Sequence, residues 1–357
     1  MKDIGNRIEI DSDDTSAIGK YFRRLEGVQG LDPASPRTTR GGSVQAHQEK
    51  VEPKVSILLC CYNGEKYLSD QIQSFKDQTH KRLDLWVSDD GSYDQTLSTI
   101  KGLLSSWRDC VHNIRTGPLE GFAANFMSLI THQGIDSDYY AYSDQDDIWE
   151  LDKIKRGISH LEKVPSNIPA LYCSRTRLVD ADNHDMGFSP LFTKQTSFTN
   201  ALMQNVGGGN TMMLNRAARD LLTDLNKDLR MVSHDWWAYL VITGCGGRAI
   251  YDPHPSVRYR QHENNLVGMN SSWSARIKRI HMLWQGRFRD WNDIHIESLQ
   301  AIRSRLTPEN QKVLDQFSKA RDQGLVSRLI GLKQSSIYRQ TLLGNLGLAV
   351  AAVFKKI

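Results

Sequence analysis

Short apolar runs that end in polar clusters constrain the fold of this chain more than any other feature of its sequence. Each run has the length of a strand and is followed by a segment with helical spacing of apolar residues. The runs and their clusters are Val55–Cys61 with Tyr62-Asn63-Gly64-Glu65, Leu83–Val87 with Ser88-Asp89-Asp90-Gly91-Ser92, and Tyr139–Tyr142 with Ser143–Trp149. Continuous apolar runs are typical of strands buried on both faces, and their alternation with helices predicts an α/β fold with a Rossmann-like, mostly parallel sheet.

Further elements continue this alternation along the chain. We expect a helix with apolar positions Leu68, Ile72 and Phe75, helices at 95–107, 122–132 and 152–162, and strands at 111–114 and 171–174. In parallel sheets with right-handed crossovers, ligands bind beyond the carboxyl ends of the strands. Because the three polar clusters follow strand ends, the sequence predicts that they converge on one site.

Composition limits the class of protein. With 39% hydrophobic and 24% charged residues among 357, the chain has the composition of an ordinary globular protein of one large or two modest domains. The formal net charge of +4 does not indicate nucleic acid as a partner. Its five cysteines form no CxxC pair, which predicts free thiols in a reducing cytosol, and the first residues lack the apolar core of a signal peptide. We therefore expect a cytoplasmic protein.

The acidic cluster Asp144, Asp146 and Asp147 has the chemistry of a cation site. Carboxylate oxygens suit Mg²⁺ or Mn²⁺, and these ions in turn bind a substrate diphosphate. Like charges this close repel one another and need compensation. The same residues could also form an acidic loop that caps the next helix, since Asp is favoured at helix starts. The convergence of three clusters favours the cation site.

Five ordered motifs extend across the central part of the chain. They are Ser56–Glu65, Ser88–Ser92, Ser143–Trp149, His234–Trp237 and Tyr259–Asn265. In this order and spacing they resemble those of a family-2 glycosyltransferase with the GT-A fold, similar to the rhamnosyltransferase-like members that build bacterial O-antigen and capsule. The resemblance covers residues 54–268. Cys61 stands where Thr or Ser is more usual in the family, and we expect little effect because cysteine is also small.

The resemblance implies a nucleotide-diphospho-sugar donor whose nucleoside binds at the first two strand ends. Tyr62 and Glu65 would lie against the base or ribose, and Asp90 would accept a hydrogen bond from the base. The residues around Asp90 can also be interpreted as an Asx-type turn, for which Asp-Gly is a common solution. Their position at a strand end favours binding.

The resemblance also implies metal ligands. Asp144 and Asp146 match the family's metal-binding pair, with Asp146 as the direct ligand and Asp144 reaching the ribose or the metal. His262 would add a contact to the metal or diphosphate, although a single histidine is more often structural. Arg260 would neutralise the diphosphate. The expected cofactor is Mn²⁺ or Mg²⁺, and imidazole suits Mn²⁺ better.

Asp235, directly before two tryptophans, matches the general base of the family. A carboxylate at this position would take the proton of the acceptor hydroxyl as that oxygen attacks the anomeric carbon, and a single displacement inverts the configuration. Asp235 could instead be only a helix N-cap, with Trp236 and Trp237 in the core. Gly208 and Gly209 would let the backbone approach the donor sugar or acceptor, unless they simply form a turn.

The chain is expected to divide into an extension, a catalytic domain and a C-terminal region. Residues 1–50 are polar and are predicted to be flexible, with a short helix near 18–25. Residues 51–268 would form the glycosyltransferase domain. Its nucleotide-binding half is expected at 51–150 and its acceptor-binding half at 151–268.

Residues 269–357 are predicted to be helical. The segment 273–291 is basic and rich in tryptophan, and the segment 342–354 is apolar but short of the roughly 20 residues that span a bilayer. These segments fit either an anionic membrane surface or a helical cap packed on the catalytic domain. The first case would place the protein peripherally on the cytoplasmic face of the inner membrane.

Together these inferences predict an inverting, metal-dependent glycosyltransferase. By the resemblance, the donor is dTDP-rhamnose or a UDP-hexose, and the acceptor is a saccharide or a lipid-linked oligosaccharide. One alternative is another divalent-metal nucleotide enzyme, a nucleotidyltransferase or a phosphohydrolase, but that class needs a basic Gly-rich loop near the first strand. A non-catalytic binding module is a third hypothesis, and the joint presence of Asp146, Asp235 and His262 argues against it.

Overall fold

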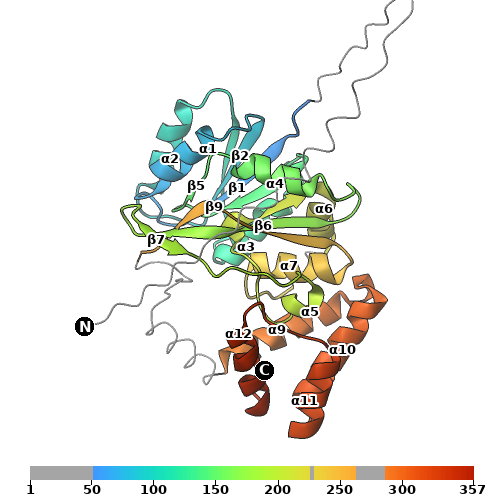
Figure 1. Cartoon of the computed structure of the whole chain (residues 1–357). Coiled ribbons are helices and arrows are strands. Elements are labelled where there is room, and N and C mark those ends of the chain that lie inside the picture. Colours follow the sequence, from blue (N-terminus) through green and yellow to red (C-terminus); the bar gives the residue numbers. More distant parts are fainter. Residues whose placement is uncertain (1–50, 226–228, 263–285) are drawn as a thin grey trace, which may run out of the picture. The chain divides into compact units, whose positions relative to one another are not determined.

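The computed structural model describes residues 51–225, 229–262 and 286–357 (Figure 1). The expected N-terminal extension, with its short helix, lies outside the described residues, as does most of the expected basic segment 273–291. All five cysteines lie within the described residues and are free thiols, as predicted.

The strands of the described residues form one sheet of nine strands in the order β3-β2-β1-β4-β8-β6-β9-β5, with β7 paired to β6. The bounds are β1 Val55–Cys61, β2 Leu83–Asp89, β3 Val111–Thr116, β4 Tyr139–Ser143, β5 Ile148–Trp149, β6 Ala170–Val179, β7 Asp185–Phe188, β8 Met213–Asn215 and β9 Arg248–Arg260. β1 pairs in parallel with β2 and β4, and β2 pairs in parallel with β3. This half confirms the predicted parallel sheet, and β8 then joins β4 to β6 through antiparallel pairs.

Helices cover both faces of the sheet. Their bounds are α1 Leu68–Lys76, α2 Thr96–Ser105, α3 Phe122–Ile130, α4 Lys153–Leu161, α5 Phe198–Ala201, α6 Arg216–Leu225, α7 His234–Gly244, α9 Arg287–Ala301, α10 Pro308–Asp322, α11 Leu325–Gln334 and α12 Leu342–Val353, with short 3₁₀ turns η1 Gly209–Thr211 and η2 Arg303–Arg305. Figure 1 shows α1 and α2 on one side of the sheet and α3 and α7 on the other. The predicted helices therefore form within one or two residues of their expected bounds.

Alternate residues of β1 point into two separate cores, because successive side chains of a strand lie on opposite faces of a sheet. Ile57 and Leu59 pack in the core that α1, α2 and α4 cover. Leu58 and Cys60 pack in the core that contains α3, α6, α7 and the C-terminal helices. The apolar run is thus continuous because both faces of β1 are buried. Only the strand's carboxyl end is left open for a site.

The strands β6 and β9 depart most from the sequence-based expectation. β6 extends to Val179, five residues beyond the predicted end, and it pairs in parallel with β9 along most of its length. β9 contains Pro253 and Pro255, and its register with β6 shifts between Ser174 and Thr176, where those prolines lie. Proline cannot donate a hydrogen bond to a neighbouring strand and is tolerated at such irregularities. Because of these two prolines, the sequence pattern does not predict β9, although this strand ends beside the predicted metal site.

The C-terminal helices α9 to α12 confirm the predicted helical region. Phe288 and Leu299 of α9, and Leu314 and Phe317 of α10, belong to the core that α7 shares. Trp291 contacts Trp236 edge-on, with ring centroids 6.0 Å apart. For α9 the structure thus supports the packed-cap interpretation. None of the helices in the described ranges is long and apolar enough to cross a membrane.

Candidate active site

Gln145 joins the loops that follow β1 and β4. Its Oε1 accepts the backbone N–H of Tyr62 at 2.8 Å, and its Nε2 donates to the Tyr62 carbonyl at 2.9 Å. A β-carbon on Gly64 would lie 2.2 Å from the same Oε1, so only glycine leaves room for this side chain. The expected nucleoside loop and the expected metal loop are therefore held against each other.

Tyr62 and Glu65, both expected at the nucleoside, face different surroundings. Glu65 Oε2 accepts the backbone N–H of Gln95 at 2.7 Å, directly before α2. Tyr62 is 55% exposed, and its ring lies edge-on to the exposed ring of Tyr93, with centroids 6.3 Å apart. Glu65 thus holds the loop after β2, whereas Tyr62 presents an aromatic ring on which a base can stack.

The carboxylate of Asp90 anchors the segment that precedes α3. Its Oδ1 accepts the backbone N–H of Leu119 at 2.7 Å, and its Oδ2 accepts that of Gly121 at 2.9 Å. Gly121 has a positive φ of 90°, which glycine adopts without strain. An ionised carboxylate has about four lone-pair positions, so Asp90 can accept a further hydrogen bond while these two remain.

The structure brings together Asp146 and His262, which are 116 residues apart in the sequence. His262 Nε2 lies 2.7 Å from Asp146 Oδ2, and the imidazole stacks on the ring of Tyr67 with centroids 5.0 Å apart. Asp144 lies nearby and partly buried, and no donor among the described residues reaches its carboxylate. Burial, followed by the charges of Asp146 and Asp235, raises the pKa of Asp144 to about 8. Burial and the neighbouring carboxylates at the end of β4 therefore disfavour the ionised form of Asp144.

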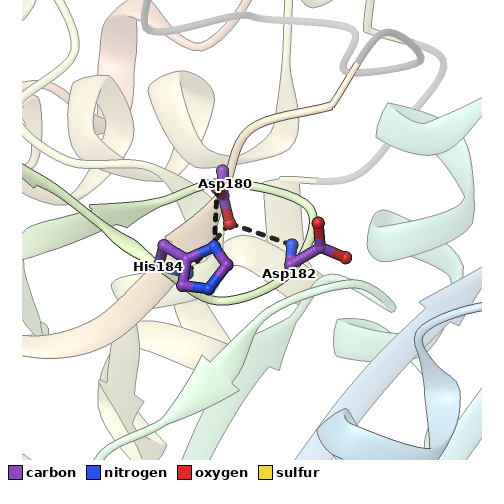
Figure 2. Close-up of side chains that lie close together, drawn as sticks. All are labelled: Asp180, Asp182 and His184. Carbon is purple, nitrogen blue, oxygen red and sulfur yellow. Dashed lines mark hydrogen bonds and ion pairs between the residues drawn. The ribbon is translucent and has the colours of Figure 1, made fainter.

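A second Asp-x-Asp group lies in the turn between β6 and β7 (Figure 2). Asp180, Asp182 and His184 are the only three ligand-type side chains of the described residues whose ligand atoms all lie within 4.8 Å of one another. Asp180 Oδ1 accepts the backbone N–H groups of Asp182 and His184, both at 2.9 Å, and Asp180 Oδ2 lies 3.1 Å from His184 Nδ1. These bonds are those of an Asx-type turn. It follows that Asp144, Asp146 and His262 do not form so tight a group in this structure.

Arg260 lies inside the protein rather than toward a ligand. It is 2% exposed, and its guanidinium donates to the Asp146 carbonyl at 3.0 Å, the Ala181 carbonyl at 2.6 Å and Asp70 Oδ2 at 2.9 Å. Its guanidinium carbon is 4.6 Å from the ring centroid of Tyr67. Arg260 thus uses three of its five N–H donors within the protein, and its expected contact with the diphosphate stays a prediction.

Asp235 occupies the first turn of α7 and is fixed by three N–H donors. Its Oδ2 accepts Asn205 Nδ2 at 2.8 Å and the backbone N–H of Gly209 at 3.0 Å, and its Oδ1 accepts the backbone N–H of Trp236 at 2.7 Å. These three donors fix the orientation of the carboxylate. Trp236 and Trp237 are buried, as the packing interpretation expected, but the N-cap of α7 is Ser233 rather than Asp235, and the general-base role of Asp235 stays a prediction.

The imidazole of His234 explains why position 209 is glycine. A β-carbon there would lie 2.4 Å from His234 Nε2 and 3.4 Å from the β-carbon of Asp235. His234 is 3% exposed, stacks on Phe126 at 3.9 Å, and neither of its ring nitrogens has a hydrogen-bond partner in the described part of the chain. Burial lowers the pKa of His234 to about 4, which keeps the ring neutral. Sequence reasoning missed His234, although its position directly before Asp235 was the available signal.

A hydrogen bond between Asn210 and Asp147 connects the loop that contains Gly208 and Gly209 to the loop that follows β4. Asp147 is fully buried, and its Oδ2 accepts Asn210 Nδ2 at 2.5 Å while its Oδ1 accepts the backbone N–H of Arg260 at 3.2 Å. A β-carbon on Gly208 would lie 2.7 Å from Asn210 Oδ1. Gly208 and Gly209 are thus both required by close neighbours. The network places the ends of β4, β9 and the loop before β8 around one site.

Comparisons with known proteins show which proteins this chain resembles. Residues 56–222 match the family model described as Glycosyl transferase family 2. The dTDP-rhamnosyl transferase RfbG of Shigella flexneri is 29% identical over 238 residues, which cover 63% of this chain and 78% of that protein. The putative glycosyltransferase EpsE of Bacillus subtilis (strain 168) is 31% identical over 111 residues, 31% of this chain and 39% of that protein. The crystal structure of S. aureus TarS 1-349 in complex with UDP-GlcNAc is 14% identical with a TM-score of 0.48, covering 79% of this chain and 90% of that chain.

Proposed function

This chain is a family-2 glycosyltransferase with a GT-A-like fold, and from that premise we propose that it transfers a sugar from a nucleotide-diphospho-sugar to a hydroxyl of a saccharide or lipid-linked acceptor with inversion. The family match confirms the predicted family and the transferase activity. It does not favour a nucleotidyltransferase or a phosphohydrolase. The observation that carries the proposal is the position of Asp144, which lies close enough to interact electrostatically both with Asp146, the partner of His262, and with Asp235, a fixed carboxylate from another element.

The nucleoside of the donor binds beyond β1 and β2 in this proposal. The exposed ring of Tyr62 stacks on the base, and Asp90 accepts a hydrogen bond from it with the lone pairs that Leu119 and Gly121 leave free. Glu65 acts as a positioning residue for the loop after β2, since it binds the backbone N–H of Gln95.

A divalent cation fits the donor atoms at the end of β4. Asp146 and His262 would hold it, with Asp144 beside them, and sites for such cations commonly use one or two carboxylates together with substrate phosphates. The cation would neutralise the charge that develops on the leaving diphosphate. An imidazole among the ligands favours Mn²⁺ over Mg²⁺. Arg260 acts here as a positioning residue, because it binds the Asp146 carbonyl from inside the protein.

Asp235 acts as the general base. It accepts the proton of the acceptor hydroxyl as that oxygen forms a bond to the anomeric carbon, while the bond from that carbon to the diphosphate oxygen breaks and its electron pair leaves with the nucleoside diphosphate. The donors on both carboxylate oxygens of Asp235 fix its orientation. A single displacement inverts the anomeric configuration.

The donor that we propose is dTDP-rhamnose, with a UDP-hexose as the second candidate. The similarity to the dTDP-rhamnosyl transferase RfbG supports this order, at 29% identity over 238 residues. We place the reaction in the cytoplasm, in the synthesis of a bacterial surface polysaccharide. Mn²⁺ or Mg²⁺ serves as the cofactor.

The proposal is tested by donor hydrolysis and transfer across a panel of nucleotide sugars with Mn²⁺, Mg²⁺ or EDTA. We expect one donor to be consumed, EDTA to stop the reaction, and Asp146→Asn to abolish it. Asp182→Asn, in the turn between β6 and β7, serves as the matched control and should retain activity. NMR of the transferred sugar should show the inverted anomer. Retention of configuration, or full activity in EDTA, would contradict the proposal.

A further inference from the structure

The last helix of the chain, α12, presents an apolar stripe to solvent. Six large side chains of this segment are exposed, from 84% for Leu342 and 72% for Leu343 to 39% for Val350. They are Leu342, Leu343, Leu346, Val350, Val353 and Phe354. At 3.6 residues per turn these positions fall within an arc of about 120°. The exposed residues therefore form one continuous face of the helix.

The opposite face of α12 packs on the protein and fixes the orientation of this stripe. Its buried residues are Leu348, Ala351 and Ala352, which lie on the far side of the helix from the exposed arc. The side chain of Thr341 caps the start of the helix by accepting the backbone N–H of Gly344 at 3.0 Å. The exposed face is thus held outward by packing and a capped helix start.

The neighbouring helix α11 repeats this pattern. Leu325, Val326, Leu329 and Ile330 are exposed on it, whereas Arg328 and Leu332 are buried. Arg328 Nη2 donates to the Val353 carbonyl at 3.3 Å and so joins α11 to the end of α12. Two adjacent helices therefore each leave an apolar face without a cover among the described residues.

All charged side chains in the C-terminal segment that contains α11 and α12 are basic. From Gln323 to Ile357 the sequence contains no Asp or Glu, and its charged side chains are Arg328, Lys333, Arg339, Lys355 and Lys356. Lys333 lies on the exposed face of α11, and Lys355 directly follows α12 and is exposed. Large apolar side chains flanked by lysines, without acidic residues, suit the boundary between the acyl chains and the anionic head groups of a bilayer.

We propose that the exposed faces of α11 and α12 dock on an anionic lipid surface. The apolar stripe enters the acyl boundary, and Lys333, Lys355 and Lys356 bind head-group phosphates. The charge pattern favours lipid over a second copy of the chain, since two such faces would bring lysines against lysines with no carboxylate between Gln323 and Ile357 to compensate them. This inference does not rest on the identity of the donor or acceptor sugar.

The test is sedimentation of the full chain with vesicles of phosphatidylcholine and phosphatidylglycerol, compared with vesicles of phosphatidylcholine alone. We expect binding to the anionic vesicles that weakens as salt is raised. Lys355→Ser with Lys356→Ser should weaken partitioning about thirtyfold. Leu346→Gln with Val353→Gln should weaken it roughly a hundredfold, because two apolar side chains no longer leave water. Met186→Gln, an exposed apolar residue of β7, is the matched control and should bind as the unaltered chain does.

The variants change exposed positions, so their far-ultraviolet circular dichroism and donor hydrolysis should match the unaltered chain. Three results would overturn the inference. The first is vesicle binding that neither pair of substitutions changes. The second is a dimer in light scattering that Leu346→Gln with Val353→Gln dissociates, which would make a second copy the occupant. The third is a chain that is monomeric in light scattering and does not bind anionic vesicles. That result would mean that another segment of the chain covers the exposed faces of α11 and α12.

Discussion

The chain contains the Asp-x-Asp spacing twice, each time near a histidine, and the two regions differ in how the carboxylates are satisfied. In the turn between β6 and β7, Asp180 accepts two backbone N–H groups and His184 comes from the same turn. At the end of β4, Asp144 has no donor among the described residues and Asp146 meets a histidine from beyond β9. The turn uses its carboxylate to stabilise itself. The strand end leaves acidic groups available to a ligand.

The comparison is tested most strongly by equivalent substitutions in the two regions. Asp146→Asn should lower kcat/KM by about a thousandfold, because a cation that stabilises the leaving diphosphate loses its ligand. Asp182→Asn should change kcat/KM less than twofold. Steady-state transfer assays with Mn²⁺ measure both variants. Equal losses in the two variants would mean that the turn group, rather than the strand end, carries the function.

The next prediction concerns Arg260, which contacts both regions through the Asp146 and Ala181 carbonyls. Arg260→Met should lower the free energy of unfolding by about 3 kcal/mol, since buried acceptors lose their donor. Chemical denaturation gives this value. Arg216→Met, which removes an exposed pair with Asp136, should cost less than about 1 kcal/mol. A stable Arg260→Met variant with a raised KM for the donor would instead indicate a direct contact with the diphosphate.

A smaller effect is expected from crowding the general base. Gly209→Ala should lower kcat about a hundredfold with little change in the donor KM, because the new β-carbon displaces His234 and with it Asp235. Gly102→Ala is the control: nothing lies within 4 Å of its β-carbon, and it replaces a helical glycine, so stability should rise slightly. Full activity in Gly209→Ala would show that Asp235 is not held by this contact.

The smallest effect is expected when Asp180, in the turn between β6 and β7, becomes protonated at low pH. The backbone N–H of His184 is the largest influence on Asp180 and holds the pKa of that carboxyl below its usual value. Because the folded pKa is depressed, the turn's contribution to stability is complete above the unfolded value of about 3.9 and is lost as pH falls through the lower folded value. Amide chemical shifts of Asp182 and His184 should move together over that range. Shifts of these two amides that change above about pH 3.9, or that do not change together, would contradict the assignment of these bonds.

Sequence patterns anticipated the parallel half of the fold because its signals are local. Val55–Cys61 is apolar throughout most of its length since both faces of the strand are buried, and Asp144 and Asp146 follow a strand directly. The residues that organise the site were less visible. His234 and Arg260 contact Gly209, Asp146 and Ala181, which are distant in sequence, so the sequence motifs that contain them do not reveal these contacts.

The fold of the second half also escaped local patterns for physical reasons. β9 carries two prolines, and its exposure does not alternate regularly, so neither of the usual strand signals is present. β5 has two residues and exists through its pairing with β9. Asp147 belongs to an acidic cluster in the sequence, and only the structure shows that it is fully buried and binds Asn210. Tertiary pairing rather than intrinsic preference determines these elements.

The two hydrogen bonds between Gln145 and the backbone of Tyr62 couple the loop after β1 to the loop after β4, so the sequences of the two loops cannot change independently. The residue that bridges the two loops sits between Asp144 and Asp146, so any change in the shape of the loop after β1 pulls directly on the metal loop. A loop graft intended to exchange one nucleobase preference for another must therefore import the matching side chain at position 145 as well. For the base and cation sites that we propose, we therefore expect base preference and cation affinity to change together.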